Sequence, residues 1–317
     1  MIKKVLICGA SGFIGRNLLE HLSKNPGLAV YGTYFNSYKS DPCPYLSKVD
    51  FTDRNASAQI VANGFDCVIN AAAITDGSIA INNDPAKYIA GNVSINNNII
   101  ETVHANRVKQ FIFLSCSILY PAHNLAPVKE NEIDSSKIHP AYRYWAEVKI
   151  FFEEMCRFYS GIDSTDWTII RHSNIYGPHD KFDPNKGHVF AATVAKITDK
   201  KNNIVAVSGN GFEKRDFLHV FDLAKAIELA ITVPLSKYEI LNIGSGTLIS
   251  IRELVEKIKN ISGQNIPIIY DGSKPTTDTS IALDTTKAEK ILGWNPDIDI
   301  DEGIRQTINW HKKRSGE

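Results

Sequence analysis

The sequence has no excess of charge of either sign, because 35 basic and 35 acidic residues cancel among its 317 residues. Nothing in this balance suggests a nucleic acid or an anionic membrane as a partner, since both attract proteins through excess positive charge. Long apolar runs are also missing, and none reaches the ~18 residues of a membrane span. We therefore expect no nucleic-acid partner and no membrane partner.

Cysteine is scarce, and the five cysteines are scattered along the chain without the spacing of metal ligands: Cys8, Cys43, Cys67, Cys116 and Cys156. An odd number of scattered cysteines indicates the reduced thiols of a cytoplasmic protein and predicts no metal site. The composition, 43% hydrophobic and 22% charged, is that of a globular chain. Its length allows one large α/β domain with a smaller companion.

Short apolar runs alternate with helical patterns in the first half of the chain. The run Val5–Cys8 is typical of a buried parallel strand, and helical spacing follows over Phe13–Leu22. Further strands are predicted at 28–34, 46–49, 67–70, 111–114 and 167–170, and further helices at 56–63, 93–106 and 146–158. This alternation predicts an α/β fold with a doubly wound parallel sheet.

The alternation loosens after Tyr176-Gly177-Pro178. Helices are predicted at 188–197, 220–230 and 250–261, and strands at 204–207 and 239–243. Ser250 and Glu253 have the spacing of a capping box at the start of the last of these helices. We place a larger domain at 1–172, which 215–244 rejoins, and a smaller lobe at 173–214 and 245–317.

A glycine-rich loop, Gly9-Ala10-Ser11-Gly12-Phe13-Ile14-Gly15, directly follows the first strand and opens a helix. In this position Gly9 permits a tight turn, Gly12 lets the backbone approach phosphates, and Gly15 lets the helix pack on the strand. The helix N-terminus would face a pyrophosphate. The loop therefore predicts a dinucleotide site, the alternative being a structural turn between strand and helix.

The second strand ends without the acidic residue that usually holds the adenosine ribose and favours NAD. Ser37 and Lys39 could instead meet a 2′-phosphate, which favours NADP over NAD. Asp50 could accept from the adenine amino group or could cap a helix, and the adjacent Phe51 is a further candidate cofactor contact. The small residues Ala71-Ala72-Ala73 allow the cofactor to approach closely or simply allow close packing.

These residues resemble the extended short-chain dehydrogenases/reductases, the NAD-dependent epimerase/dehydratase family of nucleotide-sugar enzymes. The resemblance runs from Gly9 to about Trp310, and within the family the chain is most similar to the GDP-fucose synthases, which are epimerase-reductases. Besides the glycine loop, the motifs are Asn70-Ala71-Ala72-Ala73, Asn92, 115–120, 174–184, 187–189, 209–222, 242–246 and 291–296. The resemblance makes Asn92 a candidate cofactor contact. The resemblance implies a Rossmann fold, a nicotinamide cofactor, a 4-keto sugar on a nucleoside diphosphate as substrate, and a homodimer through helices such as 93–106 and 146–158.

Members of this family carry a tyrosine four residues before a lysine, so that both side chains share one helix face. The resemblance assigns the lysine to Lys149, which would hold the nicotinamide ribose, but Trp145 stands where the tyrosine belongs. An indole only donates a hydrogen bond and is neither acid nor base near neutral pH. Tyr144 lies about 100° around a regular helix from that position. If the helix begins late, Tyr142 or Tyr144 could reach the site.

The family's hydroxyl position, at the end of the preceding strand, falls on Cys116 between Ser115 and Ser117. Ser117 or Ser115 could take over the polarisation of the sugar carbonyl, because a thiol is a poor donor. Cys116 itself is a candidate acid/base or else a buried core thiol. The cysteine that GDP-fucose synthases use for epimerisation would lie at Ile118, so that role does not carry over.

Three residues of the second half match substrate-binding positions of the family. His188 matches a second acid/base, and a histidine titrates near neutrality, although a structural histidine remains the alternative. Arg215 matches the residue that meets the substrate diphosphate, for which a guanidinium is suited, unless it pairs with Asp216 or Glu213. Asn174 binds substrate or holds a turn. The second diphosphate arginine of the family appears here as Ser280.

The favoured interpretation is an NAD(P)-dependent reductase or epimerase of a nucleotide-diphosphate sugar, with a GDP-sugar as the first guess. Its rival is a dinucleotide-binding protein without turnover, such as a redox sensor or a subunit of a partner enzyme, which the departures at Trp145 and Cys116 favour. An atypical dehydratase is a third possibility.

Overall fold

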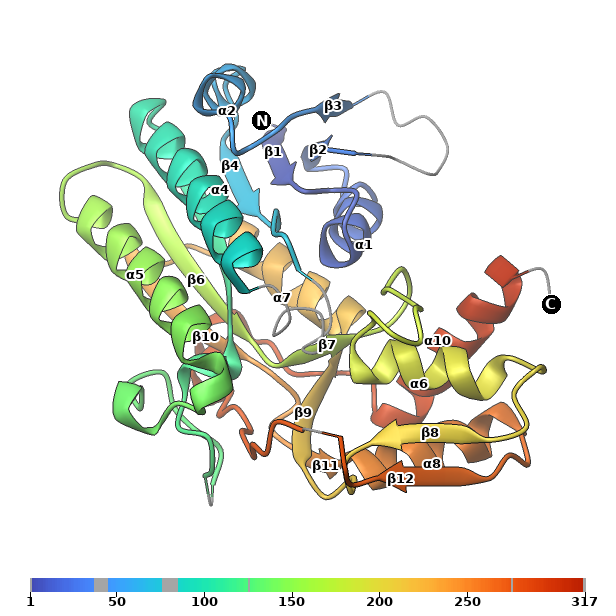
Figure 1. Cartoon of the computed structure of the whole chain (residues 1–317). Coiled ribbons are helices and arrows are strands. Elements are labelled where there is room, and N and C mark those ends of the chain that lie inside the picture. The colour runs from blue at the N-terminus through green and yellow to red at the C-terminus, as the bar shows by residue number, and fades with distance from the viewer. Residues whose placement is uncertain (1, 37–44, 76–84, 125, 275, 316–317) are drawn as a thin grey trace.

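The computed structural model describes residues 2–36, 45–75, 85–124, 126–274 and 276–315. A parallel sheet with helices on both faces forms the larger part, and a smaller part of short strands and helices lies beyond one end of this sheet (Figure 1). The predicted α/β class with a doubly wound parallel sheet is confirmed. Among the residues described, no helix is long and apolar enough to span a membrane.

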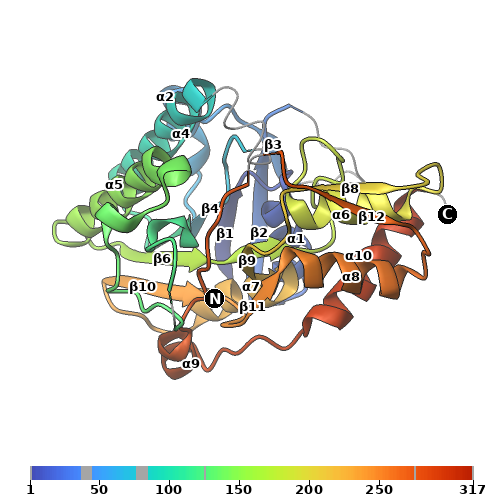
Figure 2. The same cartoon turned by 60° about the horizontal axis from the view of Figure 1, so that its bottom comes forward.

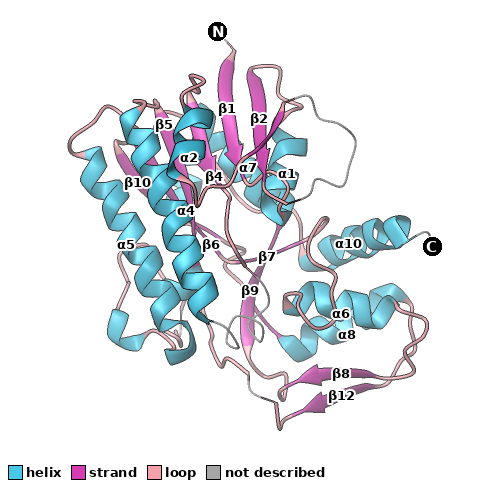
Figure 3. Cartoon of the chain, turned by 45° about the horizontal axis from the view of Figure 1, so that its top comes forward, coloured by secondary structure: helices cyan, strands magenta, loops and turns pink. Residues whose placement is uncertain are grey.

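The large sheet has seven strands in the order β10-β6-β5-β4-β1-β2-β3, and all neighbours pair in parallel. The order reverses between β1 and β4, which makes a crevice at the carboxyl ends of these strands. Those ends point toward the smaller part (Figure 3). The strands are β1 (Lys3–Cys8), β2 (Leu28–Tyr34), β3 (Leu46–Lys48), β4 (Cys67–Asn70), β5 (Gln110–Cys116), β6 (Asp166–His172) and β10 (Tyr238–Ile243).

Helices cover both faces of this sheet because its strands are apolar on both sides. On one face lie α1 (Phe13–Leu22), α7 (Val220–Thr232) and α9 (Thr286–Leu292), which share a core with Ile7, Leu114 and Ile170. On the other lie α2 (Arg54–Val61), α4 (Pro85–Ala105) and α5 (Arg143–Ser160), whose core includes Phe113 and Trp167.

The smaller part has its own apolar core, which includes Tyr176, Phe190 and Phe217. The strands β7 (Asn174–Tyr176), β9 (Lys214–His219) and β11 (Leu248–Ser250) form one sheet, and β8 (Val205–Ser208) pairs with β12 (Ile268–Asp271). The helices α6 (Val189–Thr198), α8 (Ile251–Ser262) and α10 (Ile300–Ser315) pack beside them (Figure 2). Ser250 and Glu253 form the predicted capping box.

The segment 215–244 is divided between the two parts. Its first strand, β9, pairs with β7 and β11, whereas α7 and β10 belong to the large sheet and its covering helices. The domain boundaries at 172 and 245 stay a prediction.

Candidate functional site

The turn between β1 and α1 is packed so closely that side chains are excluded at two glycines. Gly9 has a φ of +80°, and a Cβ there would lie 2.7 Å from the Cα of Ala72. A Cβ at Gly15 would lie 2.2 Å from the carbonyl oxygen of Gly9. Gly12, by contrast, is exposed and is the N-cap of α1 without a side-chain hydrogen bond to the helix. The first amides of α1 therefore face outward, and the turn fits a pyrophosphate.

The other residues of this loop surround the turn and differ in exposure. Ser11 is exposed, and Phe13 and Ile14 are half-buried at the start of α1. The Gly9 amide donates to the Thr33 hydroxyl at 2.9 Å, which fastens the turn to the end of β2.

The loop after β4 is held by two asparagines. Asn70 accepts from the amide of Ala72 at 3.2 Å and donates to Asn96 at 2.8 Å. Asn92 accepts from the amide of Ile74 at 2.9 Å and donates to the carbonyl of Ile74 at 2.8 Å. Asn92 thus uses its amide group on this backbone, so we correct its predicted cofactor contact to a supporting role. Ala71, Ala72 and Ala73 stay partly or fully exposed beside Gly9.

The predicted adenosine end of the site is described only in part. Asp50 accepts from the amide and hydroxyl of Thr52, at 2.9 and 2.7 Å, and stays half-exposed, while Asp53 caps α2. The ring of Phe51 is buried in the core, so its side chain is not a cofactor contact, contrary to the prediction. Ser37 and Lys39 lie outside the described residues.

Lys149 lies on α5 against the end of β5. Its ammonium donates to the carbonyl of Leu114 at 2.7 Å and stands 4.6 Å from the ring centroid of Phe113. Burial lowers the pKa of Lys149, which the acidic groups of Cys116 and Glu153 oppose. Lys149 thus places a positive charge near the carboxyl end of β5.

The start of α5 decides between the candidate tyrosines. The helix begins at Arg143, directly after a 3-10 turn at Pro140–Tyr142, and does not begin late. Tyr144 is therefore part of a regular helix and its side chain is 68% exposed, so the structure does not place it at the site. The indole of Trp145 packs edge-on against Tyr88 of α4, with ring centroids 6.1 Å apart.

The three candidates at the end of β5 have different surroundings. Ser115 is fully buried beside Arg171, so it is withdrawn as a group that meets substrate; its hydroxyl has no hydrogen-bond partner among the described residues. Cys116 is half-buried, and burial raises the pKa of its thiol. Ser117, in the 3-10 turn Ser117–Leu119, lines a small pocket.

This pocket brings distant predicted residues together. Ser117 and Tyr142 come from the larger part, and Asn174 and Arg215 come from β7 and β9. Arg215 donates to the carbonyls of Thr277 and Thr279, and Asn174 donates to the carbonyl of Asp216 at 3.1 Å. The pocket is lined by Ser117, Ile118, Tyr142, Asn174, Arg215, Thr279 and Ile281. It is small, and its lining includes one guanidinium and the hydroxyl groups of Ser117, Tyr142 and Thr279.

Two histidines stand at the start of α6 and at the end of β6. His188 is the N-cap of α6; its side chain is half-exposed, and its Nδ1 lies 3.7 Å from an oxygen of the buried Asp180 carboxylate. His172, which the sequence analysis did not single out, ends β6 in register with Cys116. Burial lowers the pKa of His172 to about 4, and the charges of Lys149 and His188 act in the same direction.

Comparison with known proteins agrees with this geometry. Residues 5–244 match the model of the NAD dependent epimerase/dehydratase family. The chain belongs to this family. It is 34% identical to the GDP-L-fucose synthase of Escherichia coli, over 97% of this chain and 96% of that one. It is 32% identical to a putative UDP-glucose 4-epimerase of Methanocaldococcus jannaschii, over 98% and 99%.

The fold is also that of solved members of the family. A UDP-glucose 4-epimerase of Thermotoga maritima, solved with UDP-glucose, superposes with a TM-score of 0.87 at 24% identity, over 98% of this chain and 99% of that one. The family model and the relatives above 30% identity confirm the predicted family, and the chain is an enzyme of the epimerase/dehydratase type.

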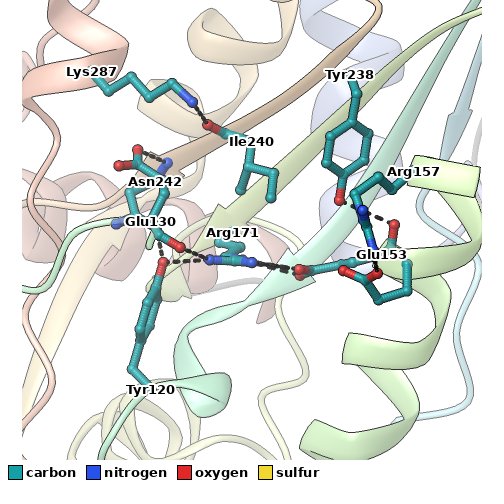
Figure 4. A network of polar contacts seen from close by, with 10 residues as sticks. Tyr120, Glu130, Glu153, Arg157, Arg171, Tyr238, Ile240, Asn242 and Lys287 are labelled. Atoms are coloured by element: carbon teal, nitrogen blue, oxygen red, sulfur yellow. Dashed lines mark hydrogen bonds and ion pairs between the residues drawn. The ribbon is translucent and has the colours of Figure 1, made fainter. Parts of the chain in front are cut away.

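In this family member a buried polar network lies directly beneath the crevice. Arg171 stands between the carboxylate of Glu153 and the phenol of Tyr120, whose hydroxyl donates to Asn242 at 2.6 Å (Figure 4). Glu153 lies one helical turn after Lys149, and Arg171 directly precedes His172. The network thus joins α5, β6 and β10 below the candidate site.

Proposed function

We propose that the chain is an NAD(P)-dependent reductase or epimerase that acts on a 4-keto sugar carried by a nucleoside diphosphate. The observation that carries this proposal is the pocket that joins Ser117 and Tyr142 to Arg215 near the Lys149 end of the sheet. A guanidinium suits a diphosphate because its donors match pairs of phosphate oxygens. Hydroxyl groups in the same lining suit a sugar oxygen.

In this proposal each residue acts on one part of the substrate or cofactor. Lys149 binds the nicotinamide ribose, Ser117 donates to the sugar carbonyl, and Arg215 binds the diphosphate. His188 exchanges a proton at a sugar carbon, with Asp180 beside it. The dinucleotide, when bound, supplies or accepts the hydride. A GDP-sugar is the first substrate to test, because several similar relatives are named GDP-L-fucose synthases.

The proposed cofactor is NADP(H) rather than NAD(H). The end of β2, Tyr34, is followed by Phe35 and Asn36, and no acidic side chain stands there to hold a ribose 2′-hydroxyl. A fluorescence titration with NADPH and NADH should give the tighter binding for NADPH, and clear preference for NADH would contradict this.

We also propose a homodimer that forms through α4 and α5, which lie side by side (Figure 1). Tyr144, Phe151 and Phe158 are spaced by seven residues along α5 and are 68%, 57% and 63% exposed. Residues seven apart share a helix face. Such an aromatic stripe is typical of a surface that a second copy covers.

The experiment that tests the proposed reaction starts from purified protein and any nucleotide that copurifies with it. The protein is incubated with NADPH or NADH and with GDP-, UDP- and dTDP-linked 4-keto sugars, GDP-4-keto-6-deoxymannose first. Oxidation of the cofactor or a new sugar product is expected, and Lys149→Met should abolish it. Tight cofactor binding without turnover of any sugar would favour the second candidate, a binding protein, which Trp145 at the usual tyrosine position supports.

A further inference from the structure

The carboxyl ends of β5 and β6 bring together titratable side chains that the sequence does not connect. The register pairs Cys116 directly with His172, and paired residues of parallel strands face the same side of a sheet. The ammonium of Lys149 donates to the carbonyl of Leu114, two residues before Cys116. Cys116 and His172 are half-buried, and so is Lys149, whose ammonium reaches the carbonyl of Leu114 from the α5 side of the sheet.

One ring nitrogen of His172 is fixed by the backbone. The Nδ1 atom lies 2.8 Å from the carbonyl oxygen of Ser173, and a carbonyl only accepts, so Nδ1 carries the hydrogen. In the neutral ring Nε2 is then a bare proton acceptor. Burial, the ammonium of Lys149 on α5 and His188 at the start of α6 all favour this neutral ring, because they lower the pKa of His172 to about 4.

The other groups near the strand ends are less suited to accept a proton. The indole of Trp145 has no atom that can accept a proton, and it packs against Tyr88. The Cys116 thiol is kept protonated, because burial raises its pKa. The phenol of Tyr142 lines the pocket and is the rival that an experiment must separate from His172.

We infer that Nε2 of His172 takes the proton from the reacting sugar oxygen and returns it, in place of the tyrosine that Trp145 replaces. The inference rests on the proposed function. In the oxidising direction the O–H bond of the sugar hydroxyl breaks, its proton passes to Nε2, and the carbonyl forms as the carbon loses a hydride to the oxidised dinucleotide. In the reducing direction the imidazolium gives the same proton to the carbonyl oxygen as the hydride returns.

The central test compares His172→Gln with the wild-type enzyme on the nucleotide sugar that the wild type turns over. Loss of a general acid/base should lower kcat by roughly 10²–10⁴-fold. NADPH affinity, measured by fluorescence, should stay unchanged, since the variant keeps the glycine turn and Lys149. His104→Gln is the matched control, because His104 pairs with Asp163 at the end of α4, and its kcat should equal the wild type's.

Two further readouts separate proton transfer from a structural role. Free imidazole should restore turnover of His172→Ala in proportion to its concentration. In the wild-type protein labelled with ¹⁵N, the Nε2 resonance of His172 should be that of a neutral acceptor at pH 7 and should shift when the nucleotide sugar binds. This second readout needs no turnover and no variant that folds.

The outcomes are distinguishable. If the wild type turns over no nucleotide sugar, the proposed function fails and the inference fails with it. If the wild type is active and His172→Gln has the kcat of the wild type, only the inference is overturned. The same holds if the Nε2 resonance of His172 does not shift when the nucleotide sugar binds. If Tyr142→Phe loses turnover while His172→Gln does not, the acid/base is the Tyr142 phenol.

Discussion

The carboxylate of Glu153 accepts from two nitrogens of Arg171, at 3.1 Å from Nε and 2.6 Å from a terminal nitrogen, and both side chains are only 3% exposed. The pair connects α5 to β6 at the level of Lys149 and His172. Both ions lose their hydration when they are buried. Their hydrogen bonds to each other and to neighbouring groups must offset this cost.

Arg171→Met should therefore destabilise the protein strongly. The variant leaves the Glu153 carboxylate buried without its cation and removes a donor from Tyr120, which should lower the free energy of unfolding by about 3–5 kcal/mol. Urea denaturation measures the change. Adding Glu153→Leu to Arg171→Met should recover part of the loss, and a double variant as unstable as the single one would contradict the argument.

Gly15→Ala should weaken dinucleotide binding. Its methyl group would lie 2.2 Å from the Gly9 carbonyl oxygen, so α1 would have to move away from β1 and carry its N-terminal amides with it. We expect an affinity for NADPH lower by at least about tenfold, the order of one hydrogen bond to a charged group. Gly272→Ala, where a Cβ meets nothing within 4 Å, is the control and should bind as the wild type does.

Arg215→Ala should raise the KM for the nucleotide sugar more than it lowers kcat. A charge-assisted pairing with the diphosphate contributes roughly 1.5–3 kcal/mol, which corresponds to a change of about 10- to 150-fold. Lys214→Ala is the matched control, since neighbouring residues of β9 point to opposite faces and Lys214 is exposed. Equal effects of the two variants on KM would exclude Arg215 as the diphosphate ligand.

The larger part of the fold follows from local patterns, whereas the smaller part does not. Runs such as Val5–Cys8 are apolar because both faces of their strands are covered, and they are read directly from the sequence. The strands β7 and β11 have three residues each and pair with distant segments, so no period marks them. Thr279 and Ile281 reach the pocket because their neighbours Ser280 and Leu283 pair with His123 and Val128.

The candidate site was predictable where a motif fixes geometry and not where register does. The glycine turn, Lys149 and Arg215 belong to motifs whose spacing sets their place. His172 lies in an ordinary apolar strand, and only the pairing of β5 with β6 shows that it adjoins Cys116. The choice between Tyr142 and Tyr144 depended on the residue at which α5 begins. The pattern of side chains predicts this residue only to within several positions.

Stability should fall as the pH drops from about 6.5 toward 4. His219 is fully buried, and burial lowers its pKa from 6.5 to about 4, as it does for His172. In this pH window the histidine is protonated in the unfolded chain and neutral in the folded protein. Each such histidine therefore lowers the free energy of unfolding by up to about 1.4 kcal/mol per pH unit as the pH falls. Urea midpoints at pH 7, 6 and 5 measure the slope.

The variant His219→Asn should flatten this slope by about one proton. In the wild type the Phe221 amide donates to Nδ1 of His219 at 3.4 Å and so caps α7. The side-chain oxygen of asparagine can accept the same hydrogen bond, so the cap is kept. An unchanged slope would show that His219 does not contribute to the pH dependence.

The last prediction concerns the stripe of aromatic side chains on α5. Phe151→Asp and Phe158→Asp together should convert the proposed dimer to a monomer, because each carboxylate would have to lose its hydration in a surface that a second copy covers. Light scattering of the eluted protein measures the mass. Phe212→Asp is the control, since Phe212 is 66% exposed but lies beside Arg252 at the start of α8, away from α5. A wild-type protein that elutes as a monomer, or a dimer that survives both substitutions, would contradict the α4–α5 interface.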